Sequence, residues 1–364
     1  MNLQPTSWNT RGGVEEIRET CVRQFHLDHE AANPPEHGLE PVEWDFDRRI
    51  FGAVVHGDRL YLAGSGEDPE LRILELAESP DGPTPVTEIR VPLEEPAAAL
   101  QAQGEELFLL AASGLQVMDL SDPLSPVLAG RVEWEIPPGS WTSLAVSGPL
   151  AVVSHSRGAP GNRNVTVGIS LIDIGDASDP REVGSLDLPE GSDNVGDLEI
   201  SGSLVLVAAR QSGLYLFDVA DPAAPRLLGN YTPRSWSRGV VVKGDVVYLS
   251  VSMTRNASSI HVLDISDPSR PALIREMETP GPAQQMAITD DRLYVADHQA
   301  GLRVYDLAEP TDPIFLGQNP TYLGQFPTEP GQPSTDLIAT EIAAGDGLVV
   351  VWGHGGMRLL RRVR

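Results

Sequence analysis

The amino-acid sequence predicts an all-β fold, a closed β-propeller of seven four-stranded antiparallel blades preceded by a short helical extension. Three observations predict it: one phrase recurs at blade-like spacing, a hairpin pattern precedes the copies, and the two ends of the chain complement each other. The prediction divides the chain into an N-terminal extension, residues 1–39, and a propeller, residues 40–364.

The recurring phrase is an apolar strand that ends in an acidic residue and is followed by an Asp-Pro or Glu-Pro turn. Its clearest copies are GLQVMDLSDP, ISLIDIGDASDP, GLYLFDVADP, IHVLDISDP and GLRVYDLAEP. Proline ends a strand because it has no N–H to donate, and the acidic side chain can accept backbone N–H groups in the turn. The acidic position is occupied by Glu75, Asp119, Asp173, Asp218, Asp264 and Asp306.

A hairpin pattern precedes these phrases, as in LEISGSLVLVAA. Residues such as Gly202 and Asp290 supply the backbone freedom of the tight turn. The second strand, residues 204–209 in this copy, is apolar on both faces, as expected for a strand buried between neighbouring sheets. The blades are predicted to begin near Phe51, Ala97, Trp141, Asp193, Trp236, Pro282 and Asp336.

The last repeat lacks a strand, and the N-terminal part of the chain supplies a candidate for it. The seventh unit has three strands, with Arg361 in the acidic position and no Asp-Pro turn after it. The segment EPVEWDF, Glu40–Phe46, is similar to the fourth strands of other blades, such as SPVLAGRVEW. We therefore expect it to complete the seventh blade, so that closure of the ring removes exposed sheet edges.

The N-terminal extension is predicted to form one amphipathic helix. Val14, Ile17, Cys21 and Phe25 recur at helical spacing and give one apolar stripe. The stripe is expected to dock on the propeller, and the alternative, docking on a second subunit, leaves a homo-oligomer open.

With this combination of strand, acidic residue, Asp-Pro pair and trailing proline, residues 50–364 resemble the LVIVD-repeat β-propeller family. The resemblance implies a secreted or surface-anchored binding module. The first residues show no basic stretch followed by an apolar core, so the sequence predicts no secretory signal there. Localisation therefore stays open.

Composition excludes several classes of partner and site. Acidic residues outnumber basic ones 52 to 26, and a formal charge of −26 repels nucleic acid and anionic lipid. No apolar run reaches the roughly 18 residues of a membrane span. The single cysteine, Cys21, excludes an intrachain disulfide, and no GxSxG elbow, P-loop or dinucleotide fingerprint occurs.

One end of the ring is expected to carry the ligand residues, because loops after the second strands and loops between blades gather there. Aromatic residues at blade starts could form a platform for a ligand, and three arginines suit an anion. A Pro- and Gly-rich insertion carries two aromatic residues that could cover the central opening. Packing between blades or simple decoration explains these residues equally well. The candidates are Trp141, Trp236, Arg210, Arg238, Arg255, Tyr322 and Phe326.

Histidines at equivalent places after the second strands suggest a divalent metal site. His298 and His354 belong to adjacent blades, and Asp297 and Asp336 are expected nearby. His155 occupies the same place on a more distant blade. The alternative interpretation makes the histidines polar hairpin residues that face water.

Together these features predict a noncatalytic binding or protein-interaction propeller, whose partner is a protein, a carbohydrate or a small anionic ligand. The alternative is an enzyme, a hydrolase, lyase or isomerase, that uses His, Asp and Arg side chains on the channel rim with or without a metal ion.

Overall fold

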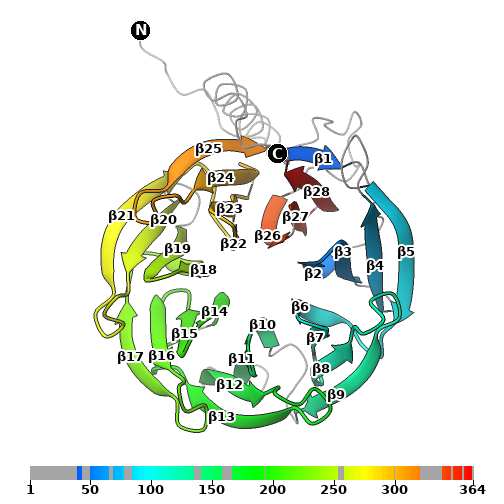
Figure 1. Ribbon diagram of the computed structural model, residues 1–364. Coiled ribbons are helices and arrows are strands. Elements are labelled where there is room, and N and C mark those ends of the chain that lie inside the picture. Colours follow the sequence, from blue (N-terminus) through cyan, green and yellow to red (C-terminus); the bar gives the residue numbers. More distant parts are fainter. Residues whose placement is uncertain are drawn as a thin grey trace, which may run out of the picture.

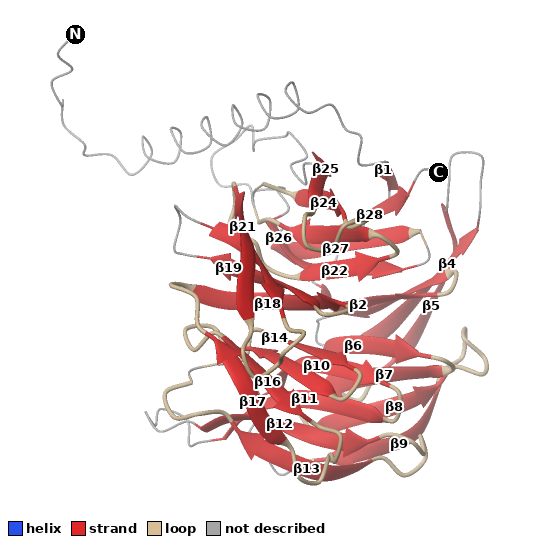
Figure 2. Cartoon of the chain, turned by 60° about the vertical axis from the view of Figure 1, so that its left-hand side comes forward, coloured by secondary structure: helices blue, strands red, loops and turns tan. Residues whose placement is uncertain are grey.

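The computed structural model shows seven four-stranded antiparallel sheets arranged in a ring (Figure 1). It describes residues 39–42, 50–64, 69–77, 84–134, 141–157, 166–192, 194–252, 258–298, 300–319, 338–345, 347–354 and 356–362. Every described element is a strand, a turn or a loop (Figure 2). The expected helix over Val14 to Phe25 lies outside the described residues. The predicted all-β propeller is confirmed.

Six blades are formed by consecutive strands, which run from the channel outwards. Blade 1 contains β2 (Ile50–His56), β3 (Arg59–Gly64), β4 (Glu70–Ala77) and β5 (Thr84–Pro92). Blade 2 contains β6 (Ala97–Gln103), β7 (Glu106–Ala111), β8 (Gly114–Asp119) and β9 (Val127–Glu133). Blade 3 contains β10 (Trp141–Ser147), β11 (Leu150–Arg157), β12 (Thr166–Asp173) and β13 (Arg181–Asp187).

The next three blades repeat this order. Blade 4 contains β14 (Asp197–Ser201), β15 (Leu204–Ala208), β16 (Leu214–Asp218) and β17 (Arg226–Tyr231). Blade 5 contains β18 (Trp236–Lys243), β19 (Val246–Ser252), β20 (Ser258–Asp264) and β21 (Ala272–Thr279). Blade 6 contains β22 (Met286–Thr289), β23 (Arg292–Ala296), β24 (Leu302–Asp306) and β25 (Ile314–Asn319).

Blade 7 joins the two ends of the chain. It consists of β26 (Ile338–Gly345), β27 (Leu348–His354), β28 (Gly356–Arg362) and, as the outer strand, β1 (Leu39–Val42). β1 pairs antiparallel with β28, from Leu39 opposite Arg362 to Val42 opposite Leu359, and Figure 1 shows the two strands side by side. The predicted closure is confirmed. Of the expected strand Glu40–Phe46, residues 43–46 lie outside the described part.

Blade 4 shows how the repeat forms its sheet. Gly202, at φ +59°, makes the tight hairpin turn between β14 and β15. Asp218 ends β16, and its Oδ1 accepts the N–H of Ala220 at 3.0 Å, as predicted for the acidic position. The outer strand β17 is half-buried to exposed along its length, whereas four of the five residues of β15 are buried. A strand of this kind needs a neighbouring blade on each side.

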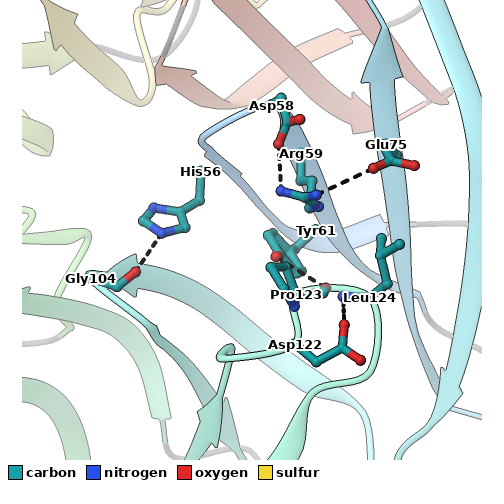
Figure 3. A network of polar contacts seen from close by, with 9 residues as sticks. All are labelled: His56, Asp58, Arg59, Tyr61, Glu75, Gly104, Asp122, Pro123 and Leu124. Carbon is teal, nitrogen blue, oxygen red and sulfur yellow. Dashed lines mark hydrogen bonds and ion pairs between the residues drawn. The ribbon is translucent and has the colours of Figure 1, made fainter.

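Neighbouring blades are joined by apolar packing and by polar contacts. Tyr61 of blade 1 is fully buried, and its hydroxyl donates to the carbonyl of Pro123 in blade 2 at 3.3 Å (Figure 3). Nearer the channel, His56 Nε2 lies 2.7 Å from the carbonyl oxygen of Gly104, also in blade 2. Full burial of a large apolar side chain contributes about 1.5–3 kcal/mol to the stability of the fold. The packing between blades therefore supplies the core that a single sheet lacks.

Candidate functional site

The central channel contains a cavity of about 390 Å³ between the first strands of the blades, β2, β6, β10, β14, β18, β22 and β26. Most of the residues that line it are apolar. Among the described residues that line it there is no lysine, arginine or histidine. Its polar side chains are Gln101, Ser143, Asp197, Glu199, Gln285 and Glu341.

The hairpin registers place these polar residues on two levels. The first strands of the blades can be aligned at the residue before each hairpin turn. In this alignment one position is held by Ser143, Asp197, Gln285 and Glu341 in blades 3, 4, 6 and 7, respectively. Glu199 lies two residues closer to its turn, so it points to the same side of β14 as Asp197. Carboxyl groups from blades 4 and 7 thus face one cavity.

The cavity raises the pKa of all three carboxyl groups. Burial raises the pKa of Asp197 to about 7, although its Oδ2 accepts the N–H of Val240 at 2.9 Å and Gln285 also hydrogen-bonds to it. Burial raises the pKa of both Glu199 and Glu341 to about 8, and the negative charge of Asp197 adds to the increase. Near neutral pH the group therefore retains protons that ordinary carboxylates would have lost.

Two of the predicted arginines meet on the rim between blades 4 and 5. Arg238 Nε donates to Ser252 Oγ at 2.6 Å, and its Nη1 donates to Gln284 Oε1 at 3.2 Å. The Arg238 guanidinium lies 5.4 Å from the centre of the Trp236 ring. Arg210 is held beside them, because its carbonyl accepts the N–H of the residue before Arg238 at 2.9 Å.

The electrostatics of this pair are unusual for so acidic a chain. Burial and the positive charge of Arg210 lower the pKa of Arg238. Among the described residues, no carboxylate oxygen forms an ion pair with Arg210 or with Arg238; the acceptors of Arg238 are the neutral groups of Ser252 and Gln284. The structure thus brings together Trp236, Arg210 and Arg238.

The described part of the structure does not show the other predicted ligand residues in this group. Trp141 begins β10 opposite His155, but its side chain lies outside the described part. Arg255, Tyr322 and Phe326 lie outside the described residues altogether.

The predicted metal ligands are only partly described. Asp297 is fully buried, and its Oδ2 lies 3.8 Å from Arg303 Nε and accepts the N–H of Gly281 at 3.3 Å. The backbone N–H of His298 donates to the carbonyl of Ala339 at 3.0 Å, which ties blade 6 to blade 7. Asp336 and the side chain of His354 lie outside the described part.

Three further observations bear on the metal prediction. In the described part of the chain, no three His, Cys, Asp or Glu side chains are grouped closely enough to hold a metal ion. His155 does not face water: it is 1% exposed, and its Nδ1 lies 3.2 Å from Ser170 Oγ. Burial raises the pKa of Asp297 well above its ordinary value, with Arg303 opposing the increase.

The channel carboxyls are the functional candidates that sequence reasoning missed. A signal for them exists in the repeat, since the position of Asp197 is held by Gly52, Ala99 and Gly239 in other blades. Aligning the first strands of the hairpins residue by residue would have shown acidic side chains where small ones are usual.

Comparisons with known proteins support the fold. The family model described as LVIVD repeat matches residues 110–133, 193–233, 236–279 and 280–321. The crystal structure of the computationally designed Ika8 protein is similar, with a TM-score of 0.59 and 12% identity, over 89% of this chain and 98% of that chain. At this identity the likeness shows the fold alone. No curated protein matches the chain. No helix in the described ranges is long and apolar enough to cross a membrane.

Proposed function

We propose that this seven-bladed propeller of LVIVD repeats is a noncatalytic binding module, which takes a small anionic ligand on the rim where Arg210 and Arg238 meet. One observation carries the proposal: two neighbouring guanidinium groups have no carboxylate ion-pair partner among the described residues. In a chain of formal charge −26, a local excess of positive charge of this kind favours an anion.

The contacts of Arg238 support a binding role because they fix the side chain without neutralising it. Its Nε and Nη1 donate to a hydroxyl and an amide oxygen, both neutral acceptors. Arginine presents five N–H donors in a rigid fork that matches carboxylate and phosphate oxygens. A guanidinium already held in place loses little conformational entropy when the ligand arrives.

The neighbours of the pair favour a small ligand with an acidic group. The ring of Trp236, close to the Arg238 guanidinium, offers an apolar surface beside the charge. An anion between the two arginines would also relieve their mutual repulsion, which contributes to the lowered pKa of Arg238. We therefore expect carboxylates and phosphates to bind better than uncharged analogues.

Calorimetric titration with phosphate, acetate and succinate, at an ionic strength held constant with sodium chloride, tests the proposal. At least one anion is expected to bind the wild-type protein, and Arg238→Gln should weaken that binding roughly tenfold or more, because a hydrogen bond to a charged group is lost. Arg238→Lys should weaken it less, since the charge remains and only the fork is lost. Binding by none of the three anions would refute the anion site.

Arg270→Gln is the matched control. Arg270 is exposed in the turn after β20, so its replacement changes the net charge equally without touching the rim. If Arg270→Gln and Arg238→Gln weaken anion binding equally, the effect comes from the overall charge of the protein and not from the rim. Chemical conversion of the bound anion by the wild-type protein, abolished in Arg238→Gln, would favour the enzyme alternative over a binding module.

A further inference from the structure

Besides the rim, we infer that the channel cavity is a second binding site, which takes a small organic cation carrying a primary ammonium group and a hydrogen-bond acceptor. Three carboxyl groups, those of Asp197, Glu199 and Glu341, face the cavity, and none of its described lining residues is basic. This site is separate from the rim arginines, neither of which lines the cavity.

The charge of the cavity wall favours a cation. Buried carboxylates are normally paired with a basic side chain or with several hydrogen-bond donors. Asp197 has such donors in the N–H groups of Val240 and Leu198, but the described residues give Glu199 and Glu341 no hydrogen bond or basic partner. Burial and the negative charge of Asp197 raise the pKa of both groups. An ammonium group supplies three donors and a positive charge.

A second, independent feature of the wall also lacks its partner. Trp352 lines the cavity from β27, directly opposite Glu341 in the register of blade 7. It is 6% exposed, and its indole N–H has no hydrogen-bond partner among the described residues. A buried donor without an acceptor is costly, so a ligand that carries an oxygen acceptor would satisfy it.

The combination favours an organic cation over a metal ion. The described carboxyls are not grouped closely enough for three of them to hold a metal. An indole N–H cannot ligate a metal, whereas the face of an indole ring attracts an ammonium group. A volume of about 390 Å³ lies within the range of small-molecule sites.

Matched pairs of small molecules test the inference in calorimetric titrations of the full chain at pH 8. The probes are ethanolamine, 3-amino-1-propanol and 4-amino-1-butanol, each compared with the diol of the same length. At least one amine is expected to bind more than tenfold tighter than its diol. Glu341→Gln, which keeps the shape of the side chain, should weaken that amine roughly ten- to hundredfold, because a hydrogen bond to a charged group is lost.

Controls separate the channel from a general effect of charge. Glu309→Gln removes the same charge from an exposed turn after β24 and should leave amine binding unchanged. The amine that binds should bind less tightly to Trp352→Phe than to wild type, since its hydroxyl oxygen loses the indole donor. Amines that bind no better than their diols, or tight binding of Mg²⁺ in their place, would overturn the inference. None of these results depends on Arg238→Gln, so the two proposed sites can fail separately.

Discussion

Replacing Glu341 by glutamine is expected to stabilise the protein at alkaline pH and to leave its stability almost unchanged at acidic pH. The pKa of Glu341 is raised from its ordinary 4.5 to about 8 in the folded chain, chiefly by burial. Between pH 4.5 and about pH 8, a carboxyl group with this raised pKa binds more protons in the folded chain than in the unfolded chain. Its presence is therefore without cost below about pH 4.5, and the free energy of unfolding falls as the pH rises towards 8.

The size of the effect follows from the two pKa values. At about 1.4 kcal/mol per pKa unit, the difference between 4.5 and about 8 corresponds to at most about 5 kcal/mol. The side chain borders a cavity, so solvent screening reduces this figure. The proton is also shared with Asp197 and Glu199, which titrate together with it. We therefore expect Glu341→Gln to raise the free energy of unfolding by about 2 kcal/mol at pH 9, by the same linkage.

Urea denaturation followed by tryptophan fluorescence at pH 5 and pH 9 measures this difference. The wild-type protein, Glu341→Gln and the exposed control Glu309→Gln are compared in the same buffers. The expected pattern is a higher denaturation midpoint for Glu341→Gln at pH 9 only. A shift of the same size at both pH values, or an equal shift in the control, would refute the explanation through buried carboxyl groups.

Three further predictions concern the repeat and its closure. Gly213→Ala should lower the free energy of unfolding by about 2 kcal/mol or more, because φ is +91° and an added Cβ would lie 2.2 Å from the Tyr231 carbonyl oxygen. Gly202→Ala, at φ +59° with no atom within 4 Å, should cost only about 1 kcal/mol in the same urea experiment. Deletion of residues 1–42 removes β1 and exposes the edge of β28, so calorimetry should show a lower Tm and light scattering should show association; an unchanged Tm would contradict closure through β1. The pKa of Asp218 is lowered by its hydrogen bonds to Ala220 and Arg226, so the destabilisation by Asp218→Asn should be largest above the ordinary pKa of 3.8 and should shrink as the pH falls below it, which denaturation at pH 7 and pH 2.5 would show.

The channel offers a physical reason for retaining groups that cost stability. In blade 5 the positions of Glu199 and Glu341 are held by Val241 and Gly239. Apolar or small side chains at these two positions would avoid the desolvation of two carboxyl groups. Local departures from the rules of packing are expected where a protein binds its ligand, in agreement with the binding site that we infer in the channel.

The repeat made the ring predictable because each of its signals is local. The Asp-Pro turn, the hairpin glycine and the doubly apolar second strand are all read within one copy of the phrase. Closure was also predictable, since a blade with three strands and a spare strand at the other end of the chain complement each other. The sequence also placed Arg210 and Arg238 on one rim, around blades 4 and 5, because loops after second strands and loops between blades gather at the same end of the ring.

Sequence alone therefore determined the number of blades, their strand order and the closing strand, because the backbone hydrogen bonds and apolar faces of one repeat leave few other solutions. Only the tertiary structure decided what faces the channel. Asp197 and Glu341 lie far apart along the chain, and a strand seen singly does not show which of its faces meets the opening. Folding into a ring brings their carboxyl groups to one cavity, and burial there, which no local pattern encodes, raises their pKa values.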